Sequence, residues 1–338
     1  MGKRDARYEF IRVISMLLVL ATHSLATVSP DYPVLSLGGR VVSTMLVWCN
    51  GLFFMISGKF ALSVCCQSSE DYRKYYLKRI GSIGIPVLVG MLLRSMYNIG
   101  SWWPEYFLSV DFLKEYLQNV LYHFASCEYW FLYKLVGFLA AAPFLGKFLQ
   151  QASRKELVWF AGVCFAWNSL TVCVSAMGLT TAWDYPFAGW LVLFALGYSL
   201  ERIAPTEKEE NRLMIWGGIS FAVTILLKCM GLTAGLDDLA PTYAVSVCAV
   251  FVALKRIYRP GKILDAVVIK IGSLTLPVYL LHMMVLYTVL PYIPQWPFLP
   301  RALTLLLATA GLSLVLSYVL DRIVLSRLQW LYRKLVGL

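Results

Sequence analysis

Long apolar runs constrain the fold of this chain more than any other feature of its sequence. Several stretches of about 18 or more residues carry almost no charge, which is the length that a helix needs to cross the hydrocarbon core of a bilayer. Of the 338 residues, 59% are hydrophobic and 14% are charged, against about 25% charged residues in an average soluble domain. The runs therefore predict an all-α integral membrane protein.

We expect a single polytopic domain over residues 1–338, built as a bundle of about ten transmembrane helices. The predicted spans are 9–29, 41–65, 80–99, 128–149, 156–178, 185–203, 213–232, 240–258, 271–291 and 299–324. The first run is too long for the apolar core of a signal peptide, so we expect it to be retained. Residues 100–127 have apolar positions at helical spacing, which predicts a surface helix in the outer interface.

The distribution of Lys and Arg predicts the orientation of the spans. If the N-terminus is cytoplasmic, 22 of the 30 basic residues fall in loops on the inside and three, Arg40, Lys114 and Arg301, fall on the outside. Such a bias is typical of cytoplasmic loops, so both termini are predicted to be cytoplasmic. The formal charge of +11 thus reports orientation, and no nucleic-acid partner is expected.

The first predicted span contains two ionisable residues, Arg12 and His23. They are eleven residues apart, which on a helix returns to within about 20° of the same face, roughly 16 Å further along the axis. Arg12 would lie near the cytoplasmic surface and His23 beyond the midplane. Ionisable groups are costly in lipid, so this stripe is expected to face protein or a water-filled cavity, and it is a candidate functional site.

Further polar residues fall at membrane depth in other predicted spans. His282 lies near the middle of the ninth span, with Tyr279 one turn before it on the same face. Ser57-Gly58 in the second span would let another helix approach closely. Arg94 lies towards the outer end of the third span. The fourth span adds the polar and aromatic residues Glu128, Trp130 and Lys134.

Histidine is the natural general base near neutral pH, and no other catalytic constellation competes. The sequence has no CxxC pair, HExxH, glycine-rich phosphate loop or GxSxG elbow, so no metal site is predicted. Structural roles stay open for each residue. His23 and His282 could form interhelical hydrogen bonds, Arg12 could be a flanking charge, and Arg94 could pair with Glu128.

Five motifs in order make the sequence similar to a known family. Arg12, ten residues and then His23 resemble the Arg-x10-His signature on the first helix of membrane-bound acyltransferase family 3. The segment 54–60, Phe-Met-Ile-Ser-Gly-Lys-Phe, resembles that family's "FFxxSGF" segment on the second helix.

The other three motifs are similar to later segments of the same family. Lys78-Arg79 followed by Ile85-Pro86 resembles "RRxxRxxxP", the sequence Trp-Phe-Leu at 130–132 resembles "WFL", and residues 273–282 resemble "SxxxYLxH". Two positions depart from the pattern. Ser82 stands where the family often has its second arginine, and Glu9 stands where Asp is expected.

The resemblance implies an acyltransferase that takes an acyl group, most simply acetyl, from cytoplasmic acyl-CoA to a hydroxyl of an extracytoplasmic surface glycan or its lipid-linked precursor. His23 would be the catalytic base or acyl carrier. Basic residues would bind the CoA phosphates: Arg12, Arg73, Lys74, Lys78 and Arg79. His282 would complete the catalytic cavity, and the acceptor would meet Ser57, Tyr279, Arg94, Glu128, Trp130 and Lys134.

The resemblance also implies a location and a donor. We expect a multi-pass protein of the cell membrane, specifically a bacterial plasma (inner) membrane, with acetyl-CoA as donor substrate and no metal. The rival interpretation is a transporter or exporter of a polar solute or polysaccharide precursor that uses the same buried charged residues. A cytoplasmic anion site paired with a deep histidine favours the enzyme, because an exporter does not require that pairing.

Overall fold

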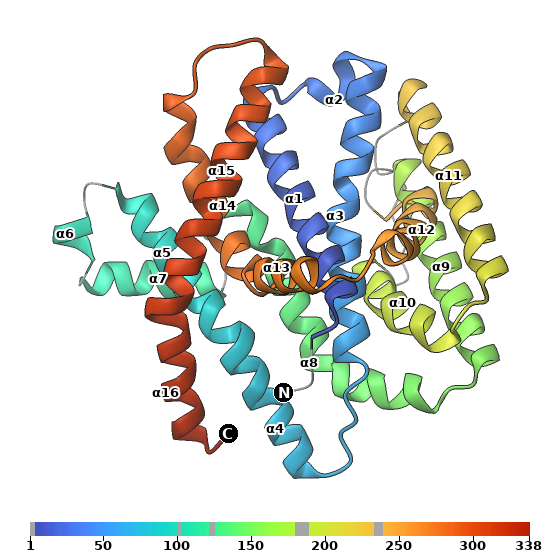
Figure 1. Cartoon of the computed structure of the whole chain (residues 1–338), viewed down its shortest axis with the longest axis horizontal. Coiled ribbons are helices and arrows are strands. Elements are labelled where there is room, and N and C mark those ends of the chain that lie inside the picture. Colours follow the sequence, from blue (N-terminus) through green and yellow to red (C-terminus); the bar gives the residue numbers. More distant parts are fainter. Residues whose placement is uncertain (1–3, 101–102, 108, 122–125, 180–188, 233–238) are drawn as a thin grey trace. The chain divides into compact units, whose positions relative to one another are not determined.

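The computed structural model describes residues 4–100, 103–107, 109–121, 126–179, 189–232 and 239–338 (Figure 1). Within these residues all regular secondary structure is helical and there is no strand, which confirms the predicted all-α class. Eight of the helices are long and apolar enough to cross a membrane.

Each of the ten predicted spans corresponds to a helix, although two of these helices are short. The eight candidate spans are Ala6–Val28, Leu37–Ala61, Ser69–Ile99, Trp130–Gln151, Arg154–Ala176, Glu207–Cys229, Thr275–Tyr292 and Phe298–Val336. The remaining two predicted spans appear as α10 (Trp190–Ile203) and α12 (Pro241–Ile257), of 14 and 17 residues. The number of spans and the cytoplasmic termini stay predictions.

The chain divides into two compact units, each made of two segments. Unit 1 comprises Met1–Cys65 and Phe138–Gly272, and unit 2 comprises Cys66–Gly137 and Ser273–Leu338. Helix α8 (Trp130–Gln151) contributes its first part to unit 2 and the rest to unit 1.

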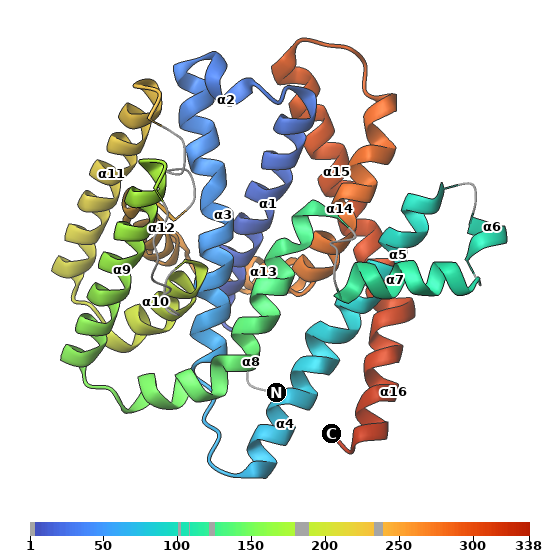
Figure 2. The same cartoon turned by 180° about the vertical axis from the view of Figure 1, so that it is seen from behind.

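Unit 1 is built around α1 (Ala6–Val28) and α3 (Leu37–Ala61), which lie side by side (Figures 1 and 2). Asp5 caps α1 by accepting a hydrogen bond from the Arg7 backbone N–H at 3.0 Å. The other elements are α2 (Tyr32–Leu35), α9 (Arg154–Ala176), α10, α11 (Glu207–Cys229), α12 and α13 (Lys262–Ser273).

Two glycines let α3 and α10 come into backbone contact. A Cβ atom on Gly58 would lie 1.7 Å from the Phe194 carbonyl oxygen, and one on Gly197 would lie 2.0 Å from the Met55 carbonyl oxygen. No larger residue fits at either position without moving a backbone. The close helix approach predicted at Ser57-Gly58 is therefore confirmed, with α10 as the partner.

Unit 2 is centred on α5 (Ile85–Ile99) and α14 (Thr275–Val289), which also meet through a glycine. A Cβ atom on Gly90 would lie 2.7 Å from Leu280 Cδ2. The surface helix predicted within 100–127 is present as α7 (Val110–Leu121). The other elements are α4 (Ser69–Arg79), η1 (Ile80–Gly84), α6 (Trp103–Tyr106), η3 (Cys127–Tyr129), η4 (Leu290–Tyr292), α15 (Phe298–Leu320), η5 (Asp321–Leu325) and α16 (Ser326–Val336).

Two predicted helix boundaries are wrong by more than two turns. The third helix begins at Ser69 rather than at 80, because Ser68 and Asp71 form a capping box ahead of α4. It then continues through the π-helical turn η1 into α5. The last helix continues in the same way through the π turn η5 to Val336 rather than ending at 324.

The ninth predicted span, 271–291, is also divided differently. Helix α13 ends at Ser273 and α14 begins at Thr275. Pro277 has no N–H to donate to the Ser273 carbonyl, which favours a break between two helices at this point, while a proline in the first turn of α14 is tolerated. Helix α13 itself was not predicted from the sequence.

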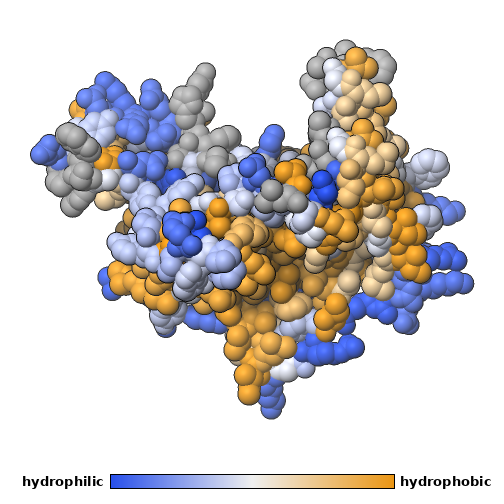
Figure 3. Space-filling view, turned by 90° about the horizontal axis from the view of Figure 1, so that it is seen from above, coloured by the Kyte–Doolittle hydropathy of each residue, from blue (hydrophilic) through white to orange (hydrophobic). Residues whose placement is uncertain are grey.

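Large apolar side chains are exposed on helices of both units, and Figure 3 shows broad hydrophobic areas on the face in view. Trp159, Ile215 and Trp216 in unit 1 and Leu307 and Val315 in unit 2 are each more than half exposed. Apolar patches of this kind are not left in water by soluble proteins. They agree with helices that face lipid.

Candidate functional site

Arg12 and His23 lie on one unbroken helix, α1. His23 follows Arg12 by eleven positions, which corresponds to a rise of roughly 16 Å along a single stripe. The intervening side chains Met16, Val19 and Leu20 are buried. Arg12 and His23 themselves are only partly buried. The structure therefore keeps the two residues on one rigid element, as the spacing predicts.

Glu9 is the partner of Arg12. Arg12 Nη1 donates to Glu9 Oε1 at 2.9 Å and to Oε2 at 2.8 Å, and Arg4 Nη1 lies 3.6 Å from the same carboxylate. Glu9 is only 4% exposed. Gly272 leaves room for it, because a Cβ atom there would lie 2.3 Å from Glu9 Oε2. Glu9 thus orients Arg12, whose side chain stays a quarter exposed and accessible to an anion.

A second charged cluster in unit 1 was not foreseen from the sequence. The Tyr8 hydroxyl donates to Glu201 Oε2 at 2.8 Å, and Lys255 Nζ donates to Glu201 Oε1. Lys59 Nζ lies 4.4 Å from the centre of the Tyr8 ring and 4.6 Å from that of Phe60, a cation–π arrangement. Charged residues at the ends of three predicted helices were the only sequence signal for this cluster.

Ser57 precedes Gly58 at the contact of α3 with α10, and its side chain is half-buried. It therefore lies beside the closest helix approach in unit 1. Its assignment to the acceptor stays a prediction.

In unit 2, His282 is fully buried on α14. Its Nδ1 lies 2.6 Å from the Tyr279 carbonyl oxygen. Because a carbonyl oxygen only accepts hydrogen bonds, Nδ1 must carry the proton, which leaves the lone pair of the neutral ring on Nε2. The helix thus fixes the tautomer in which Nε2 is the basic nitrogen.

Two tyrosine hydroxyls join α14 to the start of α8. Tyr279 donates to the Glu128 carbonyl oxygen, and Tyr129 donates to the Leu280 carbonyl oxygen at 2.9 Å. The Tyr279 ring also contacts that of His282, at 5.5 Å between centroids. The predicted residues Tyr279, His282 and Glu128 therefore come together in unit 2, with Trp130 half-buried at the beginning of α8.

Arg94 and Lys134, both predicted to orient the acceptor, differ in environment. Arg94 is 9% exposed, and its Nε and Nη1 atoms make no hydrogen bond to any described residue. Its guanidinium lies over the rings of Tyr97 and Tyr287, at 5.5 and 5.8 Å. Among the described residues no ion pair joins Arg94 to Glu128, whose carboxylate accepts a hydrogen bond from Ser126. Lys134, in contrast, is exposed.

The four predicted phosphate-binding residues other than Arg12 lie on α4. Arg73 and Lys74 are 3.2 and 3.6 Å from Glu70 and are each more than half exposed. Arg79 lies over the Tyr75 ring at 5.1 Å, and Lys78 is exposed. Surface ion pairs of this kind are weak, so the four cations stay available to an anionic ligand.

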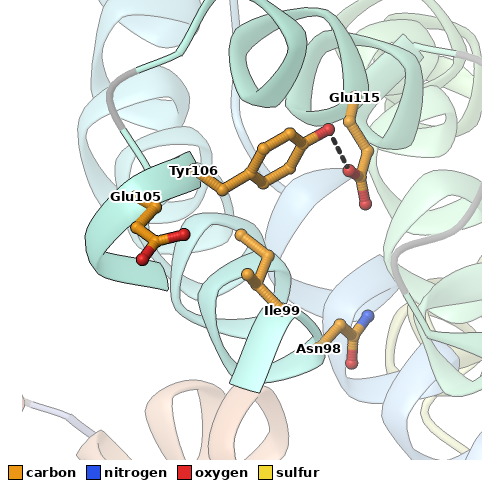
Figure 4. A pocket seen from close by; sticks show the side chains of 5 residues that line it. All are labelled: Asn98, Ile99, Glu105, Tyr106 and Glu115. Carbon is orange, nitrogen blue, oxygen red and sulfur yellow. Dashed lines mark hydrogen bonds between the residues drawn. The ribbon is translucent and has the colours of Figure 1, made fainter. Parts of the chain in front are cut away.

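Two cavities of about 500 Å³ lie in unit 2. Figure 4 shows the residues that line the first cavity, with the Tyr106 hydroxyl donating to Glu115 Oε2 at 3.1 Å; they are Asn98, Ile99, Glu105, Tyr106 and Glu115. The second is an apolar groove that Tyr97 borders. Neither cavity is lined by a residue predicted from the sequence. No cluster of metal-ligating residues occurs within the part of the chain that the structure describes.

Comparison with known proteins assigns the chain to a family. The profile of the acyltransferase 3 family, described as an acyltransferase domain, matches residues 5–322. No curated protein and no solved structure gives a match. The match covers Arg12, His23, the α4 cations, Glu128 and His282, and it extends over nearly all of the described residues. The chain therefore belongs to the acyltransferase 3 family and is a multi-pass membrane acyltransferase.

Proposed function

We propose that this acyltransferase moves an acyl group, most simply acetyl, from cytoplasmic acyl-CoA to a hydroxyl of an extracytoplasmic surface glycan or its lipid-linked precursor. One observation carries the proposal: α1 is a single helix with Arg12 near its N-terminal end and His23 near its C-terminal end. The roughly 16 Å between them is comparable with the reach of an extended pantetheine arm. The nucleotide can therefore stay at the membrane surface while the thioester enters the protein.

The donor end of the reaction needs cations for the CoA phosphates. In unit 1 the Arg12 guanidinium is held in place by the buried Glu9 carboxylate. In unit 2 the cations of α4 form a second basic surface: Arg73, Lys74, Lys78 and Arg79. Arginine binds phosphate oxygens through two parallel hydrogen bonds, so an arginine with a fixed orientation suits the donor.

The chemical step transfers the acyl group from sulfur to oxygen. The acceptor hydroxyl oxygen attacks the thioester carbonyl carbon while a histidine takes the hydroxyl proton. The tetrahedral intermediate then expels the CoA sulfur, which takes the proton back and leaves as the thiol. We assign the base to His23, because it lies at the outer end of the α1 stripe. His282 is the second basic residue of the proposed site, with its Nε2 lone pair fixed by the contact to Tyr279.

Purified protein in proteoliposomes tests the proposal. Acetyl-CoA labelled in the acetyl group is supplied with a cell-envelope glycolipid fraction from a bacterial plasma membrane, the location that we propose. The expected result is release of the CoA thiol together with label in an alkali-labile ester on the glycolipid. Movement of a polar solute across the vesicle without thiol release would instead identify an exporter.

A further inference from the structure

Arg94 is a buried charged residue of unit 2 whose guanidinium is incompletely hydrogen-bonded. Its side chain is nine-tenths buried on α5, and its Nε and Nη1 atoms donate to no described residue. A buried guanidinium stays charged at all physiological pH values, and a buried charge without a hydrogen-bonding partner is strongly destabilising. Arginine in this state at membrane depth marks a binding site by default.

The surroundings of Arg94 satisfy it only in part. The rings of Tyr97 and Tyr287 lie 5.5 and 5.8 Å from the guanidinium carbon, which gives cation–π attraction but accepts no hydrogen bond. The carboxylate of Glu128, which was predicted as a possible partner, accepts from Ser126 and forms no ion pair with Arg94. The missing partner is therefore an anion with oxygen acceptors.

An apolar groove begins at the same tyrosine. It has a volume of about 500 Å³ and lies between α5, α14 and α15. Its polar edge is formed by the hydroxyls of Tyr97 and Thr288, 3.4 Å apart. The other side chains that line the groove are aliphatic or are methionines: Leu93, Met96, Leu281, Met284, Val285, Val289, Leu312, Val315 and Leu316. A cation at one end and an apolar channel beside it match the two parts of an anionic amphiphile.

We propose that unit 2 binds a lipid phosphate, with the phosphate at Arg94 and one hydrocarbon chain in the groove between α5, α14 and α15. The inference rests on the proposed function in one respect, since it makes this lipid the anchor of the glycan acceptor. Phosphate fits because the guanidinium offers two donors in a fixed fork. A lipid phosphate should bind more tightly than inorganic phosphate, because the apolar surface of the groove contributes to binding only when a hydrocarbon chain covers it.

Lipid binding to purified, delipidated protein tests this inference without any turnover. Native mass spectrometry is used to compare dioleoyl phosphatidic acid with dioleoyl phosphatidylcholine. The second lipid has the same chains, but its headgroup is zwitterionic and carries no net charge. We expect phosphatidic acid to bind about tenfold more tightly or better, the usual effect of a charge-assisted hydrogen bond. Arg94→Gln should abolish that preference, and Arg94→Lys should restore part of it because the charge is kept and the fork is lost.

Arg322→Gln is the matched control. Arg322 belongs to the same unit and also lies over a tyrosine ring, that of Tyr318 at 5.7 Å, but it is exposed on η5. Its substitution should leave lipid binding unchanged. Arg94→Gln should also raise the thermal midpoint of the delipidated protein, because it removes an uncompensated buried charge. A lower midpoint would identify Arg94 as a structural residue and overturn the proposal.

The groove is tested by filling it. Leu312→Trp and Val315→Trp place bulk at lining positions that are 48% and 59% exposed, so both variants should fold. Each should weaken binding of phosphatidic acid about tenfold, as expected when a chain loses most of its buried apolar area. Inorganic phosphate or oleate binding as tightly as phosphatidic acid would overturn the lipid-phosphate assignment. If phosphatidic acid binds as expected but acetyl transfer is absent, only the proposed function fails.

Discussion

The two histidines at membrane depth differ in what their surroundings impose on them. His282 is fully buried and its tautomer is fixed by the Tyr279 carbonyl oxygen. His23 is partly exposed near the C-terminal end of α1. A base must accept a proton and release it during each turnover, which is easier for a ring that an acceptor and solvent can reach. This difference favours His23 as base and His282 as a positioning residue.

If His23 is the base, His23→Gln and His23→Ala should both insert and fold but lose acyl transfer by about 10²-fold or more, the usual contribution of general acid–base catalysis. Glutamine keeps size and hydrogen bonding but cannot take a proton at neutral pH. The measurement is the initial rate of CoA thiol release with acceptor present. Acetyl-CoA affinity should be retained in both variants, since the nucleotide is expected roughly 16 Å away.

His282→Gln provides the comparison for that experiment. A positioning role predicts a smaller loss of rate. If His282→Gln is inactive while His23→Gln turns over normally, the base is His282. Normal rates in both variants would contradict the acyl-transfer mechanism.

Arg12 is expected to contribute to donor binding. Arg12→Ala should weaken acetyl-CoA binding about tenfold or more, because a charge-assisted hydrogen bond to phosphate is lost. Arg12→Lys should recover part of the affinity. Calorimetric titration with CoA measures the effect. Arg40→Ala, also in unit 1 but in a predicted outside loop, is the control and should bind CoA normally.

The sequence predicts the positions of the candidate functional residues better than it predicts which residues they contact. The Arg12–His23 stripe and the glycine contact at Gly58 both follow from spacing and residue size. The Glu9–Arg12 pair and the Tyr8–Glu201–Lys255 cluster were missed. Glu9 was noted only as a departure from a pattern, and the members of the cluster are far apart in the sequence, so only the packing of α1, α10 and α12 could bring them together.

Among the helices, the apolar runs were recognised reliably, whereas the extensions of those helices were not. Helices α4, α13 and α16 are amphipathic or polar, so their sequences contain no long apolar run from which they could be predicted. Their presence depends on local capping and on packing against neighbours. For α4 the capping box at Ser68 was visible in the sequence, and it would have placed the basic residues on a helix.

The contact between α3 and α10 should be intolerant of any added side-chain atom. Gly58→Ala places a Cβ against the Phe194 carbonyl oxygen, so we expect a loss of about 1–3 kcal/mol, the usual cost of overpacking. Thermal unfolding in detergent, followed by the fluorescence of a thiol-reactive dye, measures it. Gly162→Ala on α9 is the control: no atom lies within 4 Å of its Cβ position, and alanine should stabilise that helix by about 0.5–1 kcal/mol. Equal midpoints for the two variants would contradict a backbone contact at Gly58.

For the whole molecule, orientation rests on the distribution of charges. We expect both termini to be cytoplasmic, which places Lys208 inside and Gln295 outside. In a variant without the native cysteines, Gln295→Cys should react with an impermeant maleimide in spheroplasts, and Lys208→Cys should react only after lysis. Both positions are exposed, so a difference in labelling reports sidedness. Labelling in the reverse order would invert the assignment of donor and acceptor ends.

The directions of neighbouring helices agree with alternating spans. In unit 2, Gly90 meets Leu280 and Tyr97 meets Thr288, so α5 and α14 run parallel, as two odd-numbered spans must. In unit 1, Phe54 contacts Trp190 at the start of α10, while Lys59 and Glu201 both contact Tyr8, so α3 and α10 run parallel, as two even-numbered spans must. These pairs support the predicted order of spans, which labelling can test directly.

The π turns η1 and η5 affect how unit 2 tolerates changes in chain length. Each accommodates one residue more than an α-helical turn does. Gly81 in η1 lies next to Tyr332, which follows η5, because a Cβ atom on Gly81 would lie 3.2 Å from the Tyr332 ring. Deleting one residue from 80–84 should therefore leave a regular α-helix with α4 and α5 close to their present rotation, whereas deleting a second residue would rotate α4 by about 100° relative to α5. Only the second deletion should break the bond from Arg73 to the Val336 carbonyl oxygen. The same holds at 321–325, where one deletion should be tolerated and a second should turn α16 and break the same bond.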